Sequence, residues 1–257
     1  MPDEWKFQYA VPRPPEGAVI GLSKDELERH LLNQLKEQRD NPDRALGDLA
    51  RFYGDFGQFD KALAYIRQLM DRKTDMEGKA GCILAMGATM EKAKNFEAAV
   101  RFYKEAFALE PMNTEVWDWI NNNLGFRLNT LGHFKEGESY CRQAIQIQFD
   151  RSNGHKNLAI ALEGQGRFSE AARSFITATQ VNAADGRSLK HLEELLAKHP
   201  ELEVDLGQEL EFCRKAVAVA AKALEAARPV VLKGWRKRLV LWKLAVRKWL
   251  KRLRSRL

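Results

Sequence analysis

One pattern of ten residues recurs four times and constrains the fold more than any other feature of this 257-residue chain. Its copies read GQFDKALAYI, KNFEAAVRFY, GHFKEGESYC and GRFSEAARSF, with the shared aromatic position occupied by Phe59, Phe96, Phe134 and Phe168. These residues follow one another at intervals of 37, 38 and 34 positions. Units of this length are typical of helix pairs that bury their apolar faces only by stacking on their neighbours. The pattern therefore predicts an all-α solenoid.

Small residues stand at fixed distances from each Phe. Three positions after it come Ala62, Ala99, Gly137 and Ala171, and seven further on come Ala106, Ala144 and Ala178, with the larger Leu69 in the first copy. Nine positions before it come Ala50, Gly87, Gly125 and Ala159. The distance between packed helices depends on the side chains at their contact, and small ones allow a close approach. We therefore expect these positions to face each other within a pair of helices.

In its small and aromatic positions the pattern resembles the tetratricopeptide repeat. The resemblance covers 43–185, with repeats at about 43–76, 80–113, 118–151 and 152–185. The usual Trp of the family is missing from all four copies, and only Pro111 matches its closing Pro. The resemblance implies a right-handed superhelical solenoid of helix–turn–helix repeats that binds a peptide or a helix of a partner protein in its concave groove.

Two of the repeat units are longer than the usual period of about 34 residues. The first two intervals, of 37 and 38, exceed it by about one helical turn, which lengthens a helix without rotating its buried face. We therefore expect longer helices around 72–90 and 112–130.

The segments that flank the repeats have patterns of their own. Residues 1–22 contain four prolines and predict an extended lead-in. Ser23 and Glu26 have the spacing of a capping box, which predicts an N-terminal capping helix within 23–42. Its apolar stripe is Leu27, Leu31 and Leu35. Residues 186–228 predict a degenerate fifth unit that covers the last repeat. The stripe of its second helix is Leu210, Cys213, Val217, Ala220 and Leu224.

The segment 229–257 is strongly basic. From Arg228 onward there are twelve Lys or Arg and no acid, so this part contributes +12 to a net charge of +7 and residues 1–227 carry −5. Its apolar residues recur at alternating intervals of three and four, which predicts a basic amphipathic helix with Trp residues one heptad apart. The apolar stripe is Leu232, Trp235, Leu239, Trp242, Val246, Trp249 and Leu253. The cations beside it include Arg236, Lys237, Arg238, Lys243, Arg247, Lys248, Lys251 and Arg252.

Three uses of this segment are compatible with its pattern. A basic helix with Trp residues suits an anionic membrane surface, where cations face phosphate and Trp lies at the headgroup boundary. Packing of the Trp stripe on another protein or on a second copy is the alternative, and Leu241 and Leu244 outside the stripe favour it. Nucleic acid is the third possible partner. Surfaces that stack nucleic-acid bases usually place aromatics and cations in the same groove, whereas here the Trp residues form one apolar line.

The resemblance also places a row of positions on the first helix of each repeat. Asn123 and Asn157 occupy equivalent places in repeats three and four, where Asp48 and Ala85 stand in repeats one and two. An Asn amide both donates and accepts hydrogen bonds and can pair with a peptide backbone. This resembles the asparagine ladder of the O-linked N-acetylglucosamine transferase superhelix, although Asn121 to Asn123 are also typical of a solvated helix face. The candidate groove residues are Asp48, Arg51, Trp119, Asn122, Asn123, Phe126, Lys156, Asn157 and Ile160.

Catalytic and metal-binding patterns are lacking in the sequence. The five His residues are scattered, and no nucleophile, phosphate-loop or dinucleotide motif is present. Three widely spaced Cys and the lack of a long apolar stretch predict a cytoplasmic protein, or one peripheral on the cytoplasmic face of a membrane. We therefore expect a non-catalytic adaptor without cofactor or metal. Its expected partners are another protein and an anionic membrane surface. The alternative is a structural subunit of a larger complex or a homo-oligomer, and nucleic-acid binding is the third hypothesis.

Overall fold

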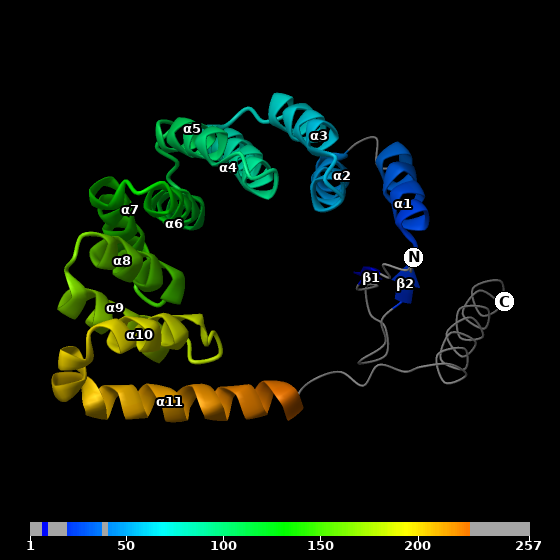
Figure 1. The fold of residues 1–257 in the computed structure, drawn as a ribbon. Coiled ribbons are helices and arrows are strands. Elements are labelled where there is room, and N and C mark those ends of the chain that lie inside the picture. The colour runs from blue at the N-terminus through cyan, green and yellow to red at the C-terminus, as the bar shows by residue number, and fades with distance from the viewer. Residues whose placement is uncertain (1–6, 10–19, 38–40, 227–257) are drawn as a thin grey trace. The chain divides into compact units, whose positions relative to one another are not determined.

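The structure is a computed structural model that describes residues 7–9, 20–37 and 41–226 (Figure 1). Helices account for most of the described residues, so the prediction of an all-α fold of paired helices is confirmed. The helices are α1 (Lys24–Glu37), α2 (Asp43–Asp55), α3 (Phe59–Asp71), α4 (Met76–Lys92), α5 (Phe96–Phe107), α6 (Thr114–Thr130), α7 (Phe134–Ile147), α8 (Ser152–Gly164), α9 (Phe168–Val181), α10 (Arg187–Lys198) and α11 (Glu203–Ala226), with a 3₁₀ turn at Pro200–Leu202.

The described residues divide into two units, one that includes residues 7–9 and 20–30 and one within Leu31–Glu225. In the first unit, β1 (Phe7–Tyr9) pairs antiparallel with β2 (Ile20–Leu22), a pairing that the proline-rich sequence did not predict. The capping box that precedes α1 is confirmed. The Ser23 backbone N–H donates to Glu26 Oε2 at 2.8 Å, and the Glu26 N–H donates to Ser23 Oγ at 3.3 Å.

The second unit is a stack of helix pairs. The tightest packing joins α2 to α3, α4 to α5, α6 to α7 and α8 to α9, and the second helix of each pair packs on the first helix of the next. The first helices also contact one another in sequence, α2 with α4, α4 with α6 and α6 with α8. This is the connectivity of stacked helix–turn–helix repeats (Figure 1).

Small residues lie where the two helices of a pair approach each other. Ala62, Ala99, Gly137 and Ala171 are buried, as are Ala50, Gly87, Gly125 and Ala159 on the facing helices. A methyl group added at Gly125 would lie 2.4 Å from Cys141 Sγ, which is much shorter than a van der Waals contact. The predicted close approach within each pair is confirmed.

The recurring Phe begins the second helix of every pair, because α3, α5, α7 and α9 start at Phe59, Phe96, Phe134 and Phe168. Three of these rings reach the end of the following first helix. The Arg127 guanidinium of α6 lies 4.6 Å above the centre of the Phe96 ring. The ring of Phe134 occupies the space next to Gly164 of α8, and Phe168 stacks on His199 with 3.8 Å between ring centres. The Phe therefore joins each of these repeats to the next.

The expected long helices are also present. Helices α4 and α6 have 17 residues each, whereas α2 and α8 have 13. The extra turn of each helix lies at its N-terminal end. There a capping side chain starts the helix before the expected first residue of the repeat, which is residue 80 for α4 and residue 118 for α6. Asp75 Oδ1 accepts from the Gly78 N–H at 2.7 Å, and Asn113 Oδ1 accepts from the Glu115 N–H at 2.9 Å.

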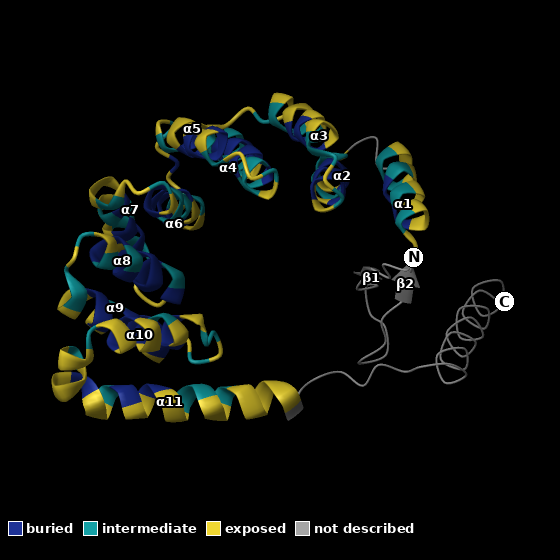
Figure 2. Ribbon diagram, in the orientation of Figure 1, coloured by how far each residue is buried: buried dark blue, intermediate teal, exposed yellow. Residues whose placement is uncertain are grey.

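Helices α10 and α11, in the segment predicted as a fifth unit, extend the core of the last repeats. This core contains Leu158, Phe175, Leu192, Leu195, Leu206, Leu210 and Cys213. The predicted stripe of α11 is buried only in its first half: Cys213 is 0% exposed, but Leu224 is 54% exposed. Helix α11 has 24 residues and α10 only 12, and every described residue from 221 to 225 is exposed (Figure 2).

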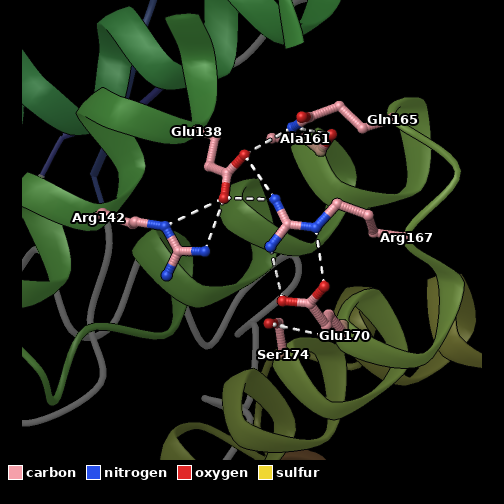
Figure 3. A network of polar contacts seen from close by, with 7 residues as sticks. All are labelled: Glu138, Arg142, Ala161, Gln165, Arg167, Glu170 and Ser174. Atoms are coloured by element: carbon pink, nitrogen blue, oxygen red, sulfur yellow. Dashed lines mark hydrogen bonds and ion pairs between the residues drawn. The ribbon is translucent and has the colours of Figure 1, made fainter. Parts of the chain in front are cut away.

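An ionic network holds α7 to the turn between α8 and α9 (Figure 3). Glu138 Oε1 accepts from Arg142 at 2.6 Å and from Arg167 at 2.8 Å, and Glu138 Oε2 accepts from Gln165 at 2.7 Å. Arg167 also donates to Glu170 at 2.6 Å. Burial disfavours the Glu138 carboxylate, but the hydrogen bonds from Gln165, Arg142 and Arg167 outweigh it and lower its pKa to about 2.

The predicted amphipathic segment 229–257, with Trp235, Trp242 and Trp249, lies outside the described residues. The expectations about its structure and contacts therefore stay predictions. In the part of the chain that the structure describes, none of the helices has the length and apolar character to cross a membrane.

Candidate partner-binding surface

A pocket with a volume of about 580 Å³ lies between the first helices α2 and α4, with α3 contributing to its wall. Small residues dominate its lining: Gly47, Ala50, Gly54, Gly78, Gly81, Ala85 and Ala88. Ile66, Leu69, Cys82 and Thr89 complete the uncharged part. Five charged residues also line it, namely Arg44, Asp48, Arg51, Lys73 and Lys92.

The pocket exists because neither helix fills the space between them with side chains. A methyl group added at Gly47 of α2 or at Gly81 of α4 would meet no atom within 4 Å. Without a Cβ at these positions, the helix backbone is open to close approach by a ligand. Volumes of about 300–1,000 Å³ are typical of pockets that bind ligands. The geometry therefore suits a ligand whose own main chain comes close to α2 and α4.

Two of the cations on the pocket wall are already paired. Lys73 Nζ lies 2.6 Å from Asp43 Oδ2, and Lys92 Nζ lies 2.5 Å from Asp55 Oδ1. The hydrogen bonds from Lys73 and Arg72 hold the pKa of Asp43 below its usual value, so this carboxylate stays ionised.

The two arginines of α2 are less engaged. Arg44 is mostly exposed, and its Nε lies 3.8 Å from Asp48 Oδ2, which is a weak surface pair. Arg51 is exposed and has no ion-pair or hydrogen-bond partner within the described ranges. It is therefore the pocket's uncompensated cation.

The structure brings together two of the predicted groove residues here, since Asp48 and Arg51 both line the pocket. Ala85, the residue of repeat two equivalent to Asp48, lies on the opposite wall. The other seven predicted groove residues are on α6 and α8, outside the pocket lining.

On α6, Trp119 is partly covered by an arginine that the sequence did not single out. Trp119 is 39% exposed, and the Arg151 guanidinium lies 4.4 Å above its ring. Arg151 Nη1 also lies 2.8 Å from Oδ2 of Asp118, which is only 2% exposed. Burial raises the pKa of Asp118 although Arg151 opposes the shift. The loop before α8 is thereby fixed on α6.

The predicted row of asparagines does not present a uniform surface. Asn157 is 3% exposed, and its Nδ2 donates to Asn122 Oδ1 at 3.0 Å. Asn129 Nδ2 donates to the Asn157 carbonyl at 2.8 Å. These amides tie α6 to α8 in the interior, because the two helices pack closely enough to bury them. Asn123, by contrast, is only half-buried, so the two equivalent positions differ in their burial.

The remaining predicted residues are also largely engaged within the fold. The Arg127 guanidinium lies 4.3 Å above the ring of Phe126, which is half-buried. Lys156 is buried, its Nζ donates to Asn153 Oδ1 at 3.3 Å, and burial lowers its pKa. Ile160 packs against the core shared by α8, α9 and α10. The geometry thus favours the α2–α4 pocket over the α6–α8 surface as the open site.

Glycines within helices are the sequence signal that could have located this pocket. Gly47, Gly78 and Gly81 stand inside helices, where Gly is less favourable than Ala by about 1 kcal/mol. A methyl group added at Gly47 or Gly81 would contact nothing, so packing does not explain these two glycines. At these two positions in the pocket lining, the missing side chains leave the helix backbone open to close approach.

Comparisons with known proteins agree with this architecture. A family model of the tetratricopeptide repeat matches residues 45–80, which include α3, most of α2 and the start of α4. Human tetratricopeptide repeat protein 7A is 30% identical over 98 residues, which are 38% of this chain and 11% of that protein. The match thus spans about a tenth of the length of the human protein.

Two solved structures share the fold at low sequence identity. BtubC from P. vanneervenii superposes with a TM-score of 0.61 at 16% identity, over 82% of this chain and 94% of that one. MamA 41-end from Desulfovibrio magneticus RS-1 gives 0.52 at 11% identity, over 72% and 96%. Together with the repeat geometry, these findings show a tetratricopeptide repeat at residues 45–80 within a solenoid whose fold the two solved structures share.

Proposed function

We propose that this protein is a non-catalytic adaptor that binds a peptide segment of a partner protein across its first helices, with the α2–α4 pocket as the anchor point. The observation that carries the proposal is a pocket of about 580 Å³ whose walls expose helix backbone at Gly47 and Gly81. The missing Cβ atoms at these two positions let a second main chain approach the helices closely.

The size of the pocket favours an extended segment over a helix. A helix is about 10 Å across and rises about 5.4 Å per turn, so little more than one turn would fill this volume. An extended segment instead places successive side chains on opposite sides. One of its side chains can then enter the pocket while the backbone passes over α2 and α4.

The proposal predicts that filling the pocket abolishes binding without harm to the fold. Peptides selected on the full chain from a random-sequence display library provide the probe. Gly81→Leu places a side chain in open space on α4 and removes a helical Gly, so the helix keeps its stability. We expect the affinity of the selected peptides, measured by fluorescence anisotropy, to fall at least about tenfold, or about 1.4 kcal/mol.

Gly207→Leu is the matched control, because Gly207 on α11 also has no atom within 4 Å of an added methyl and lies outside the pocket lining. This variant should bind the peptides like the wild type. Thermal unfolding by circular dichroism verifies that both variants fold. Equal binding by Gly81→Leu and the wild type would contradict the proposed site.

A second proposal concerns the basic segment 229–257 and rests on its sequence. We propose that it docks the adaptor on an anionic membrane surface. If half of the twelve cations from Arg228 onward lie near the lipid phosphates, at about 1 kcal/mol each, the attraction is about 6 kcal/mol, which corresponds to a Kd of tens of micromolar. This strength suits reversible recruitment.

Co-sedimentation with vesicles tests this docking. The full chain should pellet with vesicles containing phosphatidylserine and remain in solution with phosphatidylcholine alone, and a chain ending at Arg228 should bind neither. Failure of the full chain to pellet with anionic vesicles would contradict membrane docking. A concentration-dependent dimer that is lost in the shortened chain would favour the alternative, a Trp stripe that packs on a second copy.

A further inference from the structure

We infer that the side chain anchored in the α2–α4 pocket is a carboxylate, Asp or Glu, and that Arg51 is its counter-charge. The inference rests on the proposed function and specifies its ligand. It predicts that the partner segment has an acidic residue at the position that enters the pocket.

The pocket is positive although the body of the protein is not. Residues 1–227 carry a net charge of −5, since the basic segment contributes more than the whole surplus of the chain. The lining of the pocket nevertheless contains four cations and one acid. Charge complementarity across an interface selects partners and speeds their association. A locally positive pocket in an acidic body therefore selects an anionic group.

Of the four cations in the pocket lining, Arg51 is the one available to pair with a ligand. Lys73 and Lys92 are held at 2.6 and 2.5 Å by acids that stand outside the lining, Asp43 and Asp55. Asp48, the acid of the lining, is nearest to Arg44, one helical turn before it. In the described part of the chain no acid is paired with Arg51.

The chemistry of Arg51 specifies the anion. A guanidinium presents a planar set of N–H donors that matches a carboxylate in two parallel hydrogen bonds. A phosphate group carries nearly two charges and is usually held by a cluster of arginines. Among the described residues, the pocket has a single unpaired guanidinium, so a singly charged carboxylate matches it. The backbone exposed at Gly47 and Gly81 leaves room for the segment that carries this group.

A double-mutant cycle tests the inference with the selected peptides. We expect these peptides to share an Asp or Glu, and replacement of that acid by its amide should weaken binding to the wild type at least about tenfold. Arg51→Gln should weaken binding of the acidic peptide by a similar factor and should leave the amide peptide unaffected. Arg101→Gln, an exposed arginine of α5 outside the pocket, is the matched control and should change nothing.

The outcomes separate this inference from the proposed function. Selected peptides that lack a shared acid, or that bind Arg51→Gln as well as the wild type, would overturn the inference. If Gly81→Leu still blocked those peptides, the pocket would remain the binding site. Peptides that bind Gly81→Leu at full strength would overturn both proposals. An affinity that falls with added salt only when both the acid and Arg51 are present would support the pairing.

Discussion

Gly87→Ala should lower the free energy of unfolding by about 2 kcal/mol, although alanine favours a helix over glycine by about 1 kcal/mol. A Cβ at position 87 would lie 2.3 Å from Cε1 of Tyr103, and two further atoms of the same ring lie within 3 Å. Tyr103 is 0% exposed, so its ring has no free space into which to move. Helices α4 and α5 must therefore separate, and the loss of their close packing outweighs the gain in helix propensity.

Gly81→Ala on the same helix is the control for this prediction, because an added methyl there meets no atom within 4 Å. It should stabilise the protein by up to about 1 kcal/mol. Urea unfolding followed by circular dichroism measures both variants against the wild type. If Gly87→Ala were as stable as Gly81→Ala, the small residues of the repeat would not be needed for close approach of the paired helices.

Glu138→Gln should reduce the free energy of unfolding by about 2 kcal/mol at pH 7, because one neutral amide replaces a carboxylate that accepts from Gln165, Arg142 and Arg167. The pKa of Glu138 is about 2 in the folded protein and near 4.5 when the chain is unfolded. A lowered pKa contributes stability above pH 4.5. That contribution is lost as the pH falls from 4.5 towards 2, when protonation removes the charge.

The pH dependence distinguishes this network from simple packing. The difference in unfolding free energy between wild type and Glu138→Gln should be constant from about pH 6 to pH 8 and should shrink steadily below pH 4.5. Glu105→Gln, at an exposed position of α5 that has no ion pair in the described part of the chain, is the control and should change stability little. A difference that stays the same at about pH 3 would show that the charge of Glu138 is not what stabilises the turn.

Much of the fold could be predicted because the repeat is encoded locally. Each Phe marks the start of a second helix, and the small residues on either side of it mark the contact within the pair. The additional turns of α4 and α6 could be deduced from the intervals between Phe residues, since an insertion of one turn preserves the buried face. These features depend on spacing along one chain, which the sequence contains directly.

The candidate site was only partly predictable, because burial depends on how neighbouring repeats pack. Asn123 and Asn157 hold equivalent sequence positions, yet Asn157 is 3% exposed and bonded to Asn122 while Asn123 is half-buried. Asn157 lies on α8 and is bonded to α6, and α8 packs more extensively on α6 than α6 packs on α4. The packing of successive first helices also varies elsewhere, since α2 and α4 leave a pocket between them. This packing is a tertiary property that the pattern of one repeat does not specify.

The most direct test of peptide binding at the α2–α4 pocket is to locate a bound peptide on the full chain by amide chemical-shift mapping. A peptide selected on the wild type should shift the resonances of Gly47, Arg51, Gly81 and Ala85. These shifts should vanish in Gly81→Leu but persist in Gly207→Leu. Shifts confined to α6, α8 or α11, with the α2 and α4 resonances unchanged at saturation, would contradict binding at this pocket.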